Sequence, residues 1–91
     1  MRTVEVLISG RVQGVGFRAC AKRIADSLSV VGEVMNLADG RVRLVVTTEE
    51  MVLEKLVSML YGCPRAIVRE VRVVESEPLA FADFSVRKGR L

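Results

Sequence analysis

The sequence predicts an α+β domain of the ferredoxin-like, split β-α-β type, in which an antiparallel sheet carries two helices on one face. Three observations predict it. Stretches with strand and helix periodicity follow one another in the order β-α-β-β-α-β, with a short fifth strand at the end. An Asp-Gly pair joins the two central strand candidates. Each helix candidate has one apolar face, as a helix that covers a sheet requires.

The first part of this pattern is a strand, a glycine-rich turn and a helix. Residues 4–12 are the first expected strand, because Val4, Val6 and Ile8 alternate with other positions, although Leu7 interrupts the alternation. A helix is expected over about residues 17–29. Apolar side chains recur there at the spacing of one helix face: Phe17, Cys20, Ala21, Ile24 and Leu28.

A β hairpin is expected next. Residues 30–37 and 41–47 are rich in strand-forming side chains and flank Ala38-Asp39-Gly40. An Asp-Gly pair tolerates the positive φ that a tight turn needs. Thr47 and Glu50 then have the spacing of a capping box, which predicts that Thr47 caps a second helix.

The second helix and two strands complete the chain. The helix is expected to end at Gly62, and strands are expected over residues 66–75 and 81–87. The tail, residues 88–91, is expected to fray. No repeat or linker interrupts the pattern, so we expect residues 1–91 to form a single domain. We also expect a monomer, although no sequence pattern fixes the oligomeric state.

Composition restricts the chemistry. The chain has 91 residues, a formal net charge of +3 and no histidine, so reactions that need an imidazole are excluded. Cys20 and Cys63 lack the spacing of a metal motif, and we expect no metal and no cofactor. Cys20 is expected to be a small buried apolar residue, with a disulfide to Cys63 or a reactive thiol as the alternatives. Short apolar runs and the lack of a signal peptide predict a cytoplasmic protein with no membrane partner.

The stretch GRVQGVGFR at residues 10–18 is open to three interpretations. Its glycines could simply turn the chain between strand and helix. Gly14 to Ala19 also match G-x-G-x-x-A, but the hairpin that follows does not fit the further β-α-β units of a dinucleotide-binding domain. The third interpretation is a phosphate-binding loop, in which backbone N–H groups of residues 14–18 and the guanidinium of Arg18 surround an anion. This interpretation explains both the glycines and the arginine.

A phosphate-binding loop without a nearby imidazole predicts a class of substrate. The leaving group must depart without a proton, and in an acyl phosphate the leaving group is a carboxylate. Water then suffices as the nucleophile, provided that a side chain holds it in line. A neutral carboxamide can do so, and besides Gln13 the chain offers only Asn36, near the end of the second expected strand. A turn residue is the alternative role for Asn36.

Two separated segments, GRVQGVGFR at 10–18 and GEVMNLADGRV at 32–42, resemble the acylphosphatase family, and FADFSVRK near the end is similar to its closing strand. The resemblance implies five strands, two helices and the hydrolysis of acyl phosphates to a carboxylate and inorganic phosphate without metal or cofactor. It implies that Arg18 binds the phosphoryl group and that Asn36 orients the water. Inorganic phosphate or similar anions are then expected as product or inhibitors. The loop that the resemblance assigns to phosphate binding comprises Gln13, Gly14, Val15, Gly16 and Phe17.

Two other classes of function fit the same element order. A split β-α-β domain can bind RNA on its open sheet face, but neither central strand carries an aromatic side chain on which a base could stack. We therefore expect no nucleic-acid partner. The other class is a regulatory or domain-like use of the pocket, as in larger proteins whose acylphosphatase-like segment handles carbamoyl phosphate.

Overall fold

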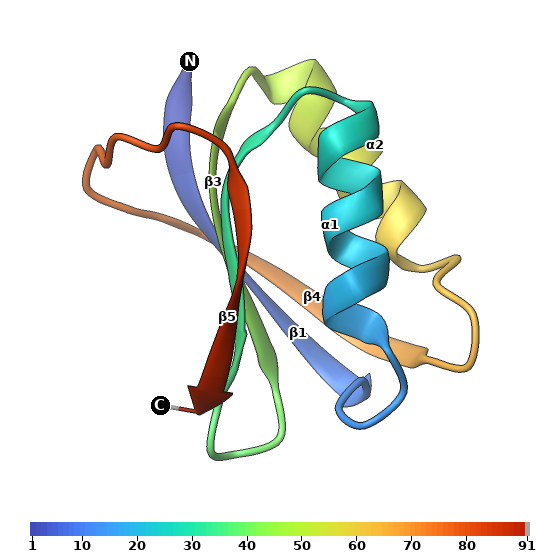
Figure 1. Cartoon of the computed structure of the whole chain (residues 1–91). Coiled ribbons are helices and arrows are strands. Elements are labelled where there is room, and N and C mark those ends of the chain that lie inside the picture. Colours follow the sequence, from blue (N-terminus) through green and yellow to red (C-terminus); the bar gives the residue numbers. More distant parts are fainter. Residues whose placement is uncertain (91) are drawn as a thin grey trace.

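The computed structural model describes residues 1–90, with side chains to residue 89, and these residues form two helices and a five-stranded sheet (Figure 1). The strand order is β4-β1-β3-β2-β5. Within this part of the chain, neither helix is long and apolar enough to cross a membrane. The elements in chain order are β1 (Arg2–Arg11), α1 (Phe17–Ser27), β2 (Val31–Asn36), β3 (Val42–Thr48), α2 (Glu50–Leu60), β4 (Ile67–Glu75) and β5 (Phe84–Arg90).

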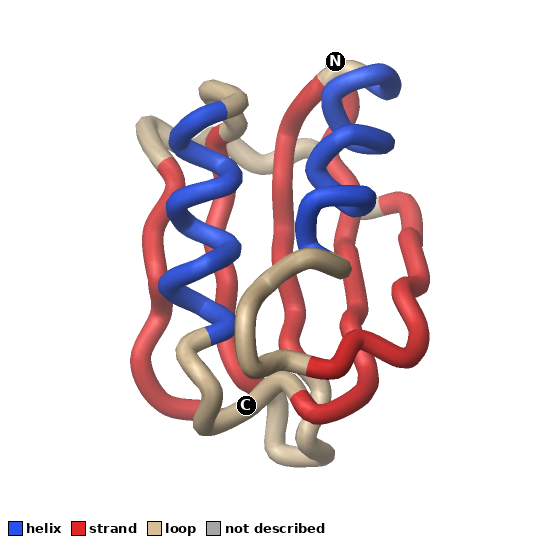
Figure 2. The backbone as a smooth tube through the Cα atoms, turned by 90° about the vertical axis from the view of Figure 1, so that its right-hand side faces the viewer, coloured by secondary structure: helices blue, strands red, loops and turns tan. Residues whose placement is uncertain are grey.

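Both helices pack on the same face of the sheet, and the core lies between the two layers (Figures 1 and 2). Strand side chains alternate between the two faces, so every second residue of β1 points to the helices. Val4, Val6 and Ile8 are accordingly fully buried. Phe17 and Leu56 meet them from the helix side and are also fully buried. The expected arrangement, a sheet that carries both helices on one face, is confirmed.

The direction of β5 departs from the antiparallel sheet that the sequence predicts, because β5 runs parallel to β2. The connection over residues 76–83 stays at one end of the sheet, where the backbone N–H of Ser76 donates to the carbonyl of Thr3 (Figure 1). A strand that begins where β4 finished must run opposite to β4 and therefore parallel to β2. The sheet is mixed rather than antiparallel.

The fifth strand also lies further along the chain than expected. Its pairing with β2 begins at Gly32 and Phe84 and continues to Asn36 and Arg90, so the strand covers 84–90 rather than 81–87. The expected fraying is therefore wrong for residues 88–90, while Leu91 lies outside the described residues.

Helix α1 ends two residues before the predicted boundary. Ser29 has a φ of 56°, which lies in the left-handed region, and the N–H of Val30 donates to the carbonyl of Ala25 at 2.9 Å. A left-handed residue after the last turn is a common way to satisfy helix carbonyls. The helix therefore stops at Ser27.

The capping box predicted for α2 does not form. Strand β3 continues through Thr48, so Thr47 is still part of the sheet, and its hydroxyl lies 2.7 Å from that of Thr3. Glu49 occupies the N-cap position, without a side-chain capping bond. The Thr47 hydroxyl, which the local sequence pattern assigns to the helix N-cap, contacts Thr3 instead, because Thr47 is held in β3 by its pairing with β1.

Cys20 is buried as expected, but it is not a free apolar thiol. It forms a disulfide with Cys63, which lies just after α2 and is also buried. The preferred expectation is therefore wrong, and the disulfide alternative describes the structure. The bond joins the first half of α1 to the loop between α2 and β4, two segments that are 43 positions apart in the chain.

Candidate functional site

A pocket of about 220 Å³ opens where β1 leads into α1, at the lower end of the sheet in Figure 1. It lies between the loop that precedes α1, the first turn of that helix and the final residue of β2. The residues that line it are Val12, Gly14, Gly16, Phe17, Arg18, Ala19, Asn36 and Val86.

The loop before α1 leaves the start of the helix uncapped. Gly14 and Gly16 have φ values of 75° and 77°, in the left-handed region that glycine adopts most readily. Gly16 is the N-cap residue, and because it has no side chain it provides no capping bond. The first helical hydrogen bond runs from the N–H of Cys20 to the carbonyl of Gly16 at 3.1 Å. The N–H groups of the first helical turn thus lack carbonyl partners within the helix.

These N–H groups lie at the positive end of the α1 dipole, and the first turn of α1 contains no acidic residue. An anion in the pocket would receive hydrogen bonds from them and be stabilised by the dipole. The uncapped start of α1 therefore lies at the position where the sequence predicts a phosphate loop.

Gly10, the first glycine of the motif, has a different role. It lies in β1, where the register of pairing with β4 shifts between Ser9 and Gly10. A Cβ atom at Gly10 would collide with the carbonyl group of Ile67. Its glycine is required for the close approach of the two strands and not for the pocket.

Arg18 lines the pocket, and a hydrogen bond to β5 holds its guanidinium in place. One Nη donates to the carbonyl of Arg87 on β5 at 2.8 Å. A guanidinium has five N–H donors, so this contact orients the group and leaves the others for a ligand. The arrangement suits a planar, permanently charged clamp for two oxygens of a phosphoryl group.

Asn36 is the last residue of β2, and only 8% of its surface is exposed. Its side-chain Oδ1 is buried and has no hydrogen-bond partner within the described residues. A buried acceptor without a partner costs about 1–3 kcal/mol. Asn36 also lines the pocket, so its carboxamide lies beside the space in which the sequence predicts that a water is held.

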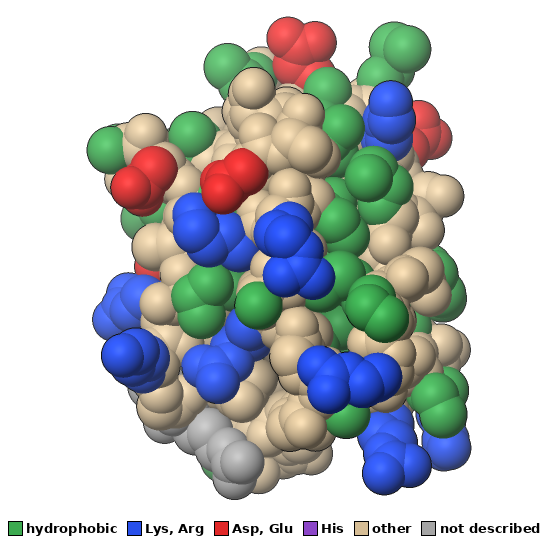
Figure 3. All heavy atoms as spheres, turned by 45° about the vertical axis from the view of Figure 1, so that its right-hand side comes forward, with side chains coloured by type: hydrophobic (Ala, Val, Ile, Leu, Met, Phe, Trp, Pro, Cys, Tyr) green, Lys and Arg blue, Asp and Glu red, His purple; other side chains and the backbone are tan. Residues whose placement is uncertain are grey.

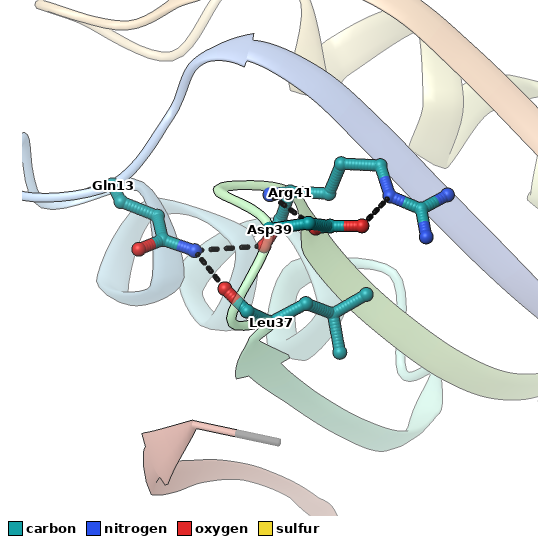
Figure 4. Close-up of polar contacts among 4 residues, drawn as sticks. All are labelled: Gln13, Leu37, Asp39 and Arg41. Atoms are coloured by element: carbon teal, nitrogen blue, oxygen red, sulfur yellow. Dashed lines mark hydrogen bonds and ion pairs between the residues drawn. The ribbon is translucent and has the colours of Figure 1, made fainter.

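Gln13 lies in the predicted phosphate loop, yet its side chain points to the hairpin (Figure 4). Its Nε2 donates to the carbonyls of Leu37 at 2.8 Å and Arg41 at 2.9 Å. Leu37 directly follows Asn36, so these bonds fix the loop relative to the proposed water-holding residue. The Gln13 side chain is a positioning group rather than part of the pocket lining.

The hairpin that Gln13 contacts is stabilised by its own turn. Asp39 accepts from the backbone N–H of Arg41 at 3.0 Å and from the Arg41 Nε at 2.8 Å (Figure 4). The backbone hydrogen bond from Arg41, followed by its side-chain hydrogen bond and charge, holds the pKa of Asp39 below its ordinary value. Asp39 thus serves the turn, as the sequence predicts.

The structure brings five of the seven predicted site residues to one pocket and leaves two outside its lining. Gly14, Gly16, Phe17, Arg18 and Asn36 line the pocket. The side chain of Gln13 bonds to the hairpin, and Val15 is half-buried and packs on the core.

Three lining residues were not among the predicted site residues. They are Val12, Ala19 and Val86. Val12 and Ala19 adjoin the motif, and Val86 lies in the closing-strand segment FADFSVRK, so their positions in the chain were the available signal. Within residues 1–90, no group of three or more Cys, Asp and Glu side chains lies together as a metal ion would require.

Known proteins are similar to this chain over nearly its whole length, and they support the resemblance seen in the two sequence motifs. The family model described as Acylphosphatase matches residues 4–86. The acylphosphatase of Archaeoglobus fulgidus is 42% identical over 87 residues, which cover 94% of this chain and 98% of that protein.

Solved structures are similar in fold as well as in sequence. The crystal structure of acylphosphatase from Bacillus subtilis has a TM-score of 0.89 and 33% identity, and covers 97% of this chain and 100% of its own. A structure of full-length HypF has a TM-score of 0.88 and 28% identity, and the match covers 98% of this chain but 12% of that one. With both the sequence model and full-length relatives in agreement, this chain belongs to the acylphosphatase family.

Proposed function

We propose that the hydrolysis of acyl phosphates, the activity that family membership assigns to this chain, takes place in the pocket between the glycine loop, α1 and Asn36. One observation carries this proposal. The side chain of Asn36, whose buried Oδ1 has no partner within the described residues, and the uncapped N-terminus of α1 line the same pocket. A bound water that donates a hydrogen bond to this oxygen removes the cost of leaving it unpaired.

The phosphoryl group of the substrate binds at the start of α1. Backbone N–H groups of Phe17, Arg18 and Ala19 donate to its oxygens, and the Arg18 guanidinium provides a permanent positive charge beside them. We extend the same site to the backbone N–H groups of residues 13–16, of which Gly14 and Gly16 line the pocket. The bond from Arg18 to the carbonyl of Arg87 keeps the guanidinium in place before substrate arrives.

The reaction itself needs positioning more than proton transfer. The water held by Asn36 forms a bond to phosphorus as the bond between phosphorus and the carboxyl oxygen breaks, and the electron pair leaves with the carboxylate. The proton released by the water passes to a phosphoryl oxygen, so the products are a carboxylate and inorganic phosphate. Since the carboxylate departs without protonation and the transition state is loose, neither an imidazole nor a metal ion takes part.

The test is the release of phosphate from benzoyl phosphate in the presence of EDTA, measured for the parent protein, Arg18→Gln and Asn36→Ala. We expect each variant to lose about a hundredfold or more of kcat/KM, because each removes a group aimed at the reacting atoms. Arg23→Gln is the matched control. It removes the same charge from an exposed position on the same helix, and its activity is expected to stay that of the parent.

Two results would overturn the assignment. A folded parent without turnover would show that the pocket does not catalyse this reaction. Activity of Arg18→Gln and Asn36→Ala equal to that of the parent would show that other residues carry it. Circular dichroism of each variant separates either result from loss of the fold.

We further propose that the protein works as a cytoplasmic monomer, binds inorganic phosphate as product, and has no nucleic-acid or membrane partner. Phe17 and Phe84 are buried in the core, so neither can stack on a base. Disulfides occur in intracellular proteins of hyperthermophilic organisms, so the Cys20–Cys63 bond does not exclude this location. Sedimentation of the purified protein with and without phosphate tests the oligomeric state.

A further inference from the structure

Arg65 lies beside the glycine loop, although it belongs to the segment between α2 and β4. A Cβ atom built on Gly16 would lie 3.2 Å from the Nη2 of Arg65, so the guanidinium is in contact range of the residue that caps α1. Gly16 lines the pocket, whereas Arg65 does not. The Arg65 side chain is therefore next to the pocket lining but not part of it, and we use the word rim for this position.

The loop that carries Arg65 is held against α1. Cys63, two residues earlier, is joined by the disulfide to Cys20 in α1, one turn after Gly16. The turn after α2 is fixed by the N–H of Cys63, which donates to the carbonyl of Leu60. Arg65 is thus placed beside the glycine loop by a covalent link rather than by a contact of its own charge.

The charge of Arg65 is unpaired within the part of the chain whose side chains are described. Its guanidinium has no ion pair or hydrogen bond there, and the first turn of α1 contributes no acid. On the face that Figure 3 draws, most Lys and Arg side chains lie in the middle and lower parts, while Asp and Glu side chains lie toward the top and the left edge. An anion at the mouth of the pocket would therefore meet an exposed positive charge without a competing carboxylate.

We propose that Arg65 is a specificity-determining residue, which favours acyl phosphates whose acyl part carries a second negative charge, such as a carboxylate. The proposal rests on the proposed function. In this proposal the acyl part of a substrate whose phosphoryl group occupies the pocket extends to the rim, within reach of the Arg65 guanidinium. A carboxylate on the acyl part forms an ion pair with the guanidinium, and a methyl group in its place does not.

The test compares succinyl phosphate with butyryl phosphate, which have acyl chains of equal length and differ in the terminal group. The measured quantity is the ratio of their kcat/KM values. We expect Arg65→Gln to lower this ratio about fivefold and to leave butyryl phosphate hydrolysis unchanged, because an exposed ion pair contributes an effect of that order. Arg65→Lys keeps most of the preference. Raising the salt concentration to about 1 M reduces it in the parent, because screening weakens exposed ion pairs.

Two further variants separate this role from a structural one. Arg65 has a φ of 65°, so Arg65→Gly suits the backbone at least as well and is expected to lower the substrate ratio without lowering the free energy of unfolding. Arg23→Gln removes the same charge away from the rim and is expected to leave the ratio unchanged. The proposal is overturned if Arg65→Gln leaves the ratio of the two kcat/KM values unchanged, or if it lowers kcat/KM equally for both substrates. If the parent hydrolyses neither substrate, the proposed function fails instead.

Discussion

The two helices begin in different electrostatic surroundings, although each has the positive end of its dipole at the N-terminus. Helix α2 begins with Glu50, whose carboxylate lies in the first turn and pairs with Arg2 at 3.2 Å. Helix α1 begins after Gly16, with no side-chain cap and no acid in its first turn. The fold thus places an acidic side chain at the N-terminus of α2 and none at that of α1, and this difference supports the proposed binding of an anion from solution at α1.

Adding an acid to α1 breaks this difference and has the largest expected effect. Ala19 lies in the first turn of α1, lines the pocket and is exposed, so Ala19→Glu copies the arrangement of α2 without disturbing the core. We expect kcat/KM for benzoyl phosphate to fall about a thousandfold, because a carboxylate near the phosphoryl group repels it by about 4 kcal/mol. The free energy of unfolding should stay equal or rise slightly, since the carboxylate stabilises the helix dipole.

Ala19→Gln is the control for this change, because glutamine has nearly the same size and no charge. It is expected to retain most of the activity of the parent. If Ala19→Gln and Ala19→Glu lose activity equally, the loss is steric, and the electrostatic reading of the two N-termini is wrong. Inhibition by inorganic phosphate should weaken in Ala19→Glu alone.

Removal of the Cys20–Cys63 disulfide is expected to lower the free energy of unfolding. The double variant Cys20→Ala and Cys63→Ala is expected to lower the free energy of unfolding by about 2–4 kcal/mol, because the bond closes a long loop in the unfolded chain. Urea unfolding measures the loss, and reduction of the parent with dithiothreitol should reproduce it. Equal midpoints for the double variant and the oxidised parent would contradict this role.

The patterns that predicted the fold are local ones. Alternation in Val4, Val6 and Ile8 located β1, and Asp39-Gly40 located the hairpin, because each depends on residues that are neighbours in the chain. The motif residues Arg18 and Asn36 were expected in one site, and they do line one pocket. Their roles in the reaction stay predictions that the Arg18→Gln and Asn36→Ala variants test.

What escaped prediction depends on contacts between distant segments. The Thr47 hydroxyl could bond to a helix N–H or to Thr3, and the pairing of β1 with β3 decided for Thr3. The Gln13 side chain bonds to two hairpin carbonyls that no local pattern brings near it. The position of Arg65 beside Gly16 likewise follows from the packing of α2 and the disulfide, and nothing in the neighbouring sequence indicates it.

The smallest effect is expected at the other N-terminus. Glu50→Gln removes the acid from the first turn of α2 and its pair with Arg2, and should lower the free energy of unfolding by about 0.5 kcal/mol with no change in kcat/KM. Glu54→Gln, one turn later on the same helix, is the control and should cost less, because the dipole acts mainly within the first turn. Urea unfolding at low and high salt measures both. A loss of activity in Glu50→Gln would mean that the two helix ends are coupled, whereas unchanged activity with lower stability would show that the acid at the start of α2 serves the fold alone.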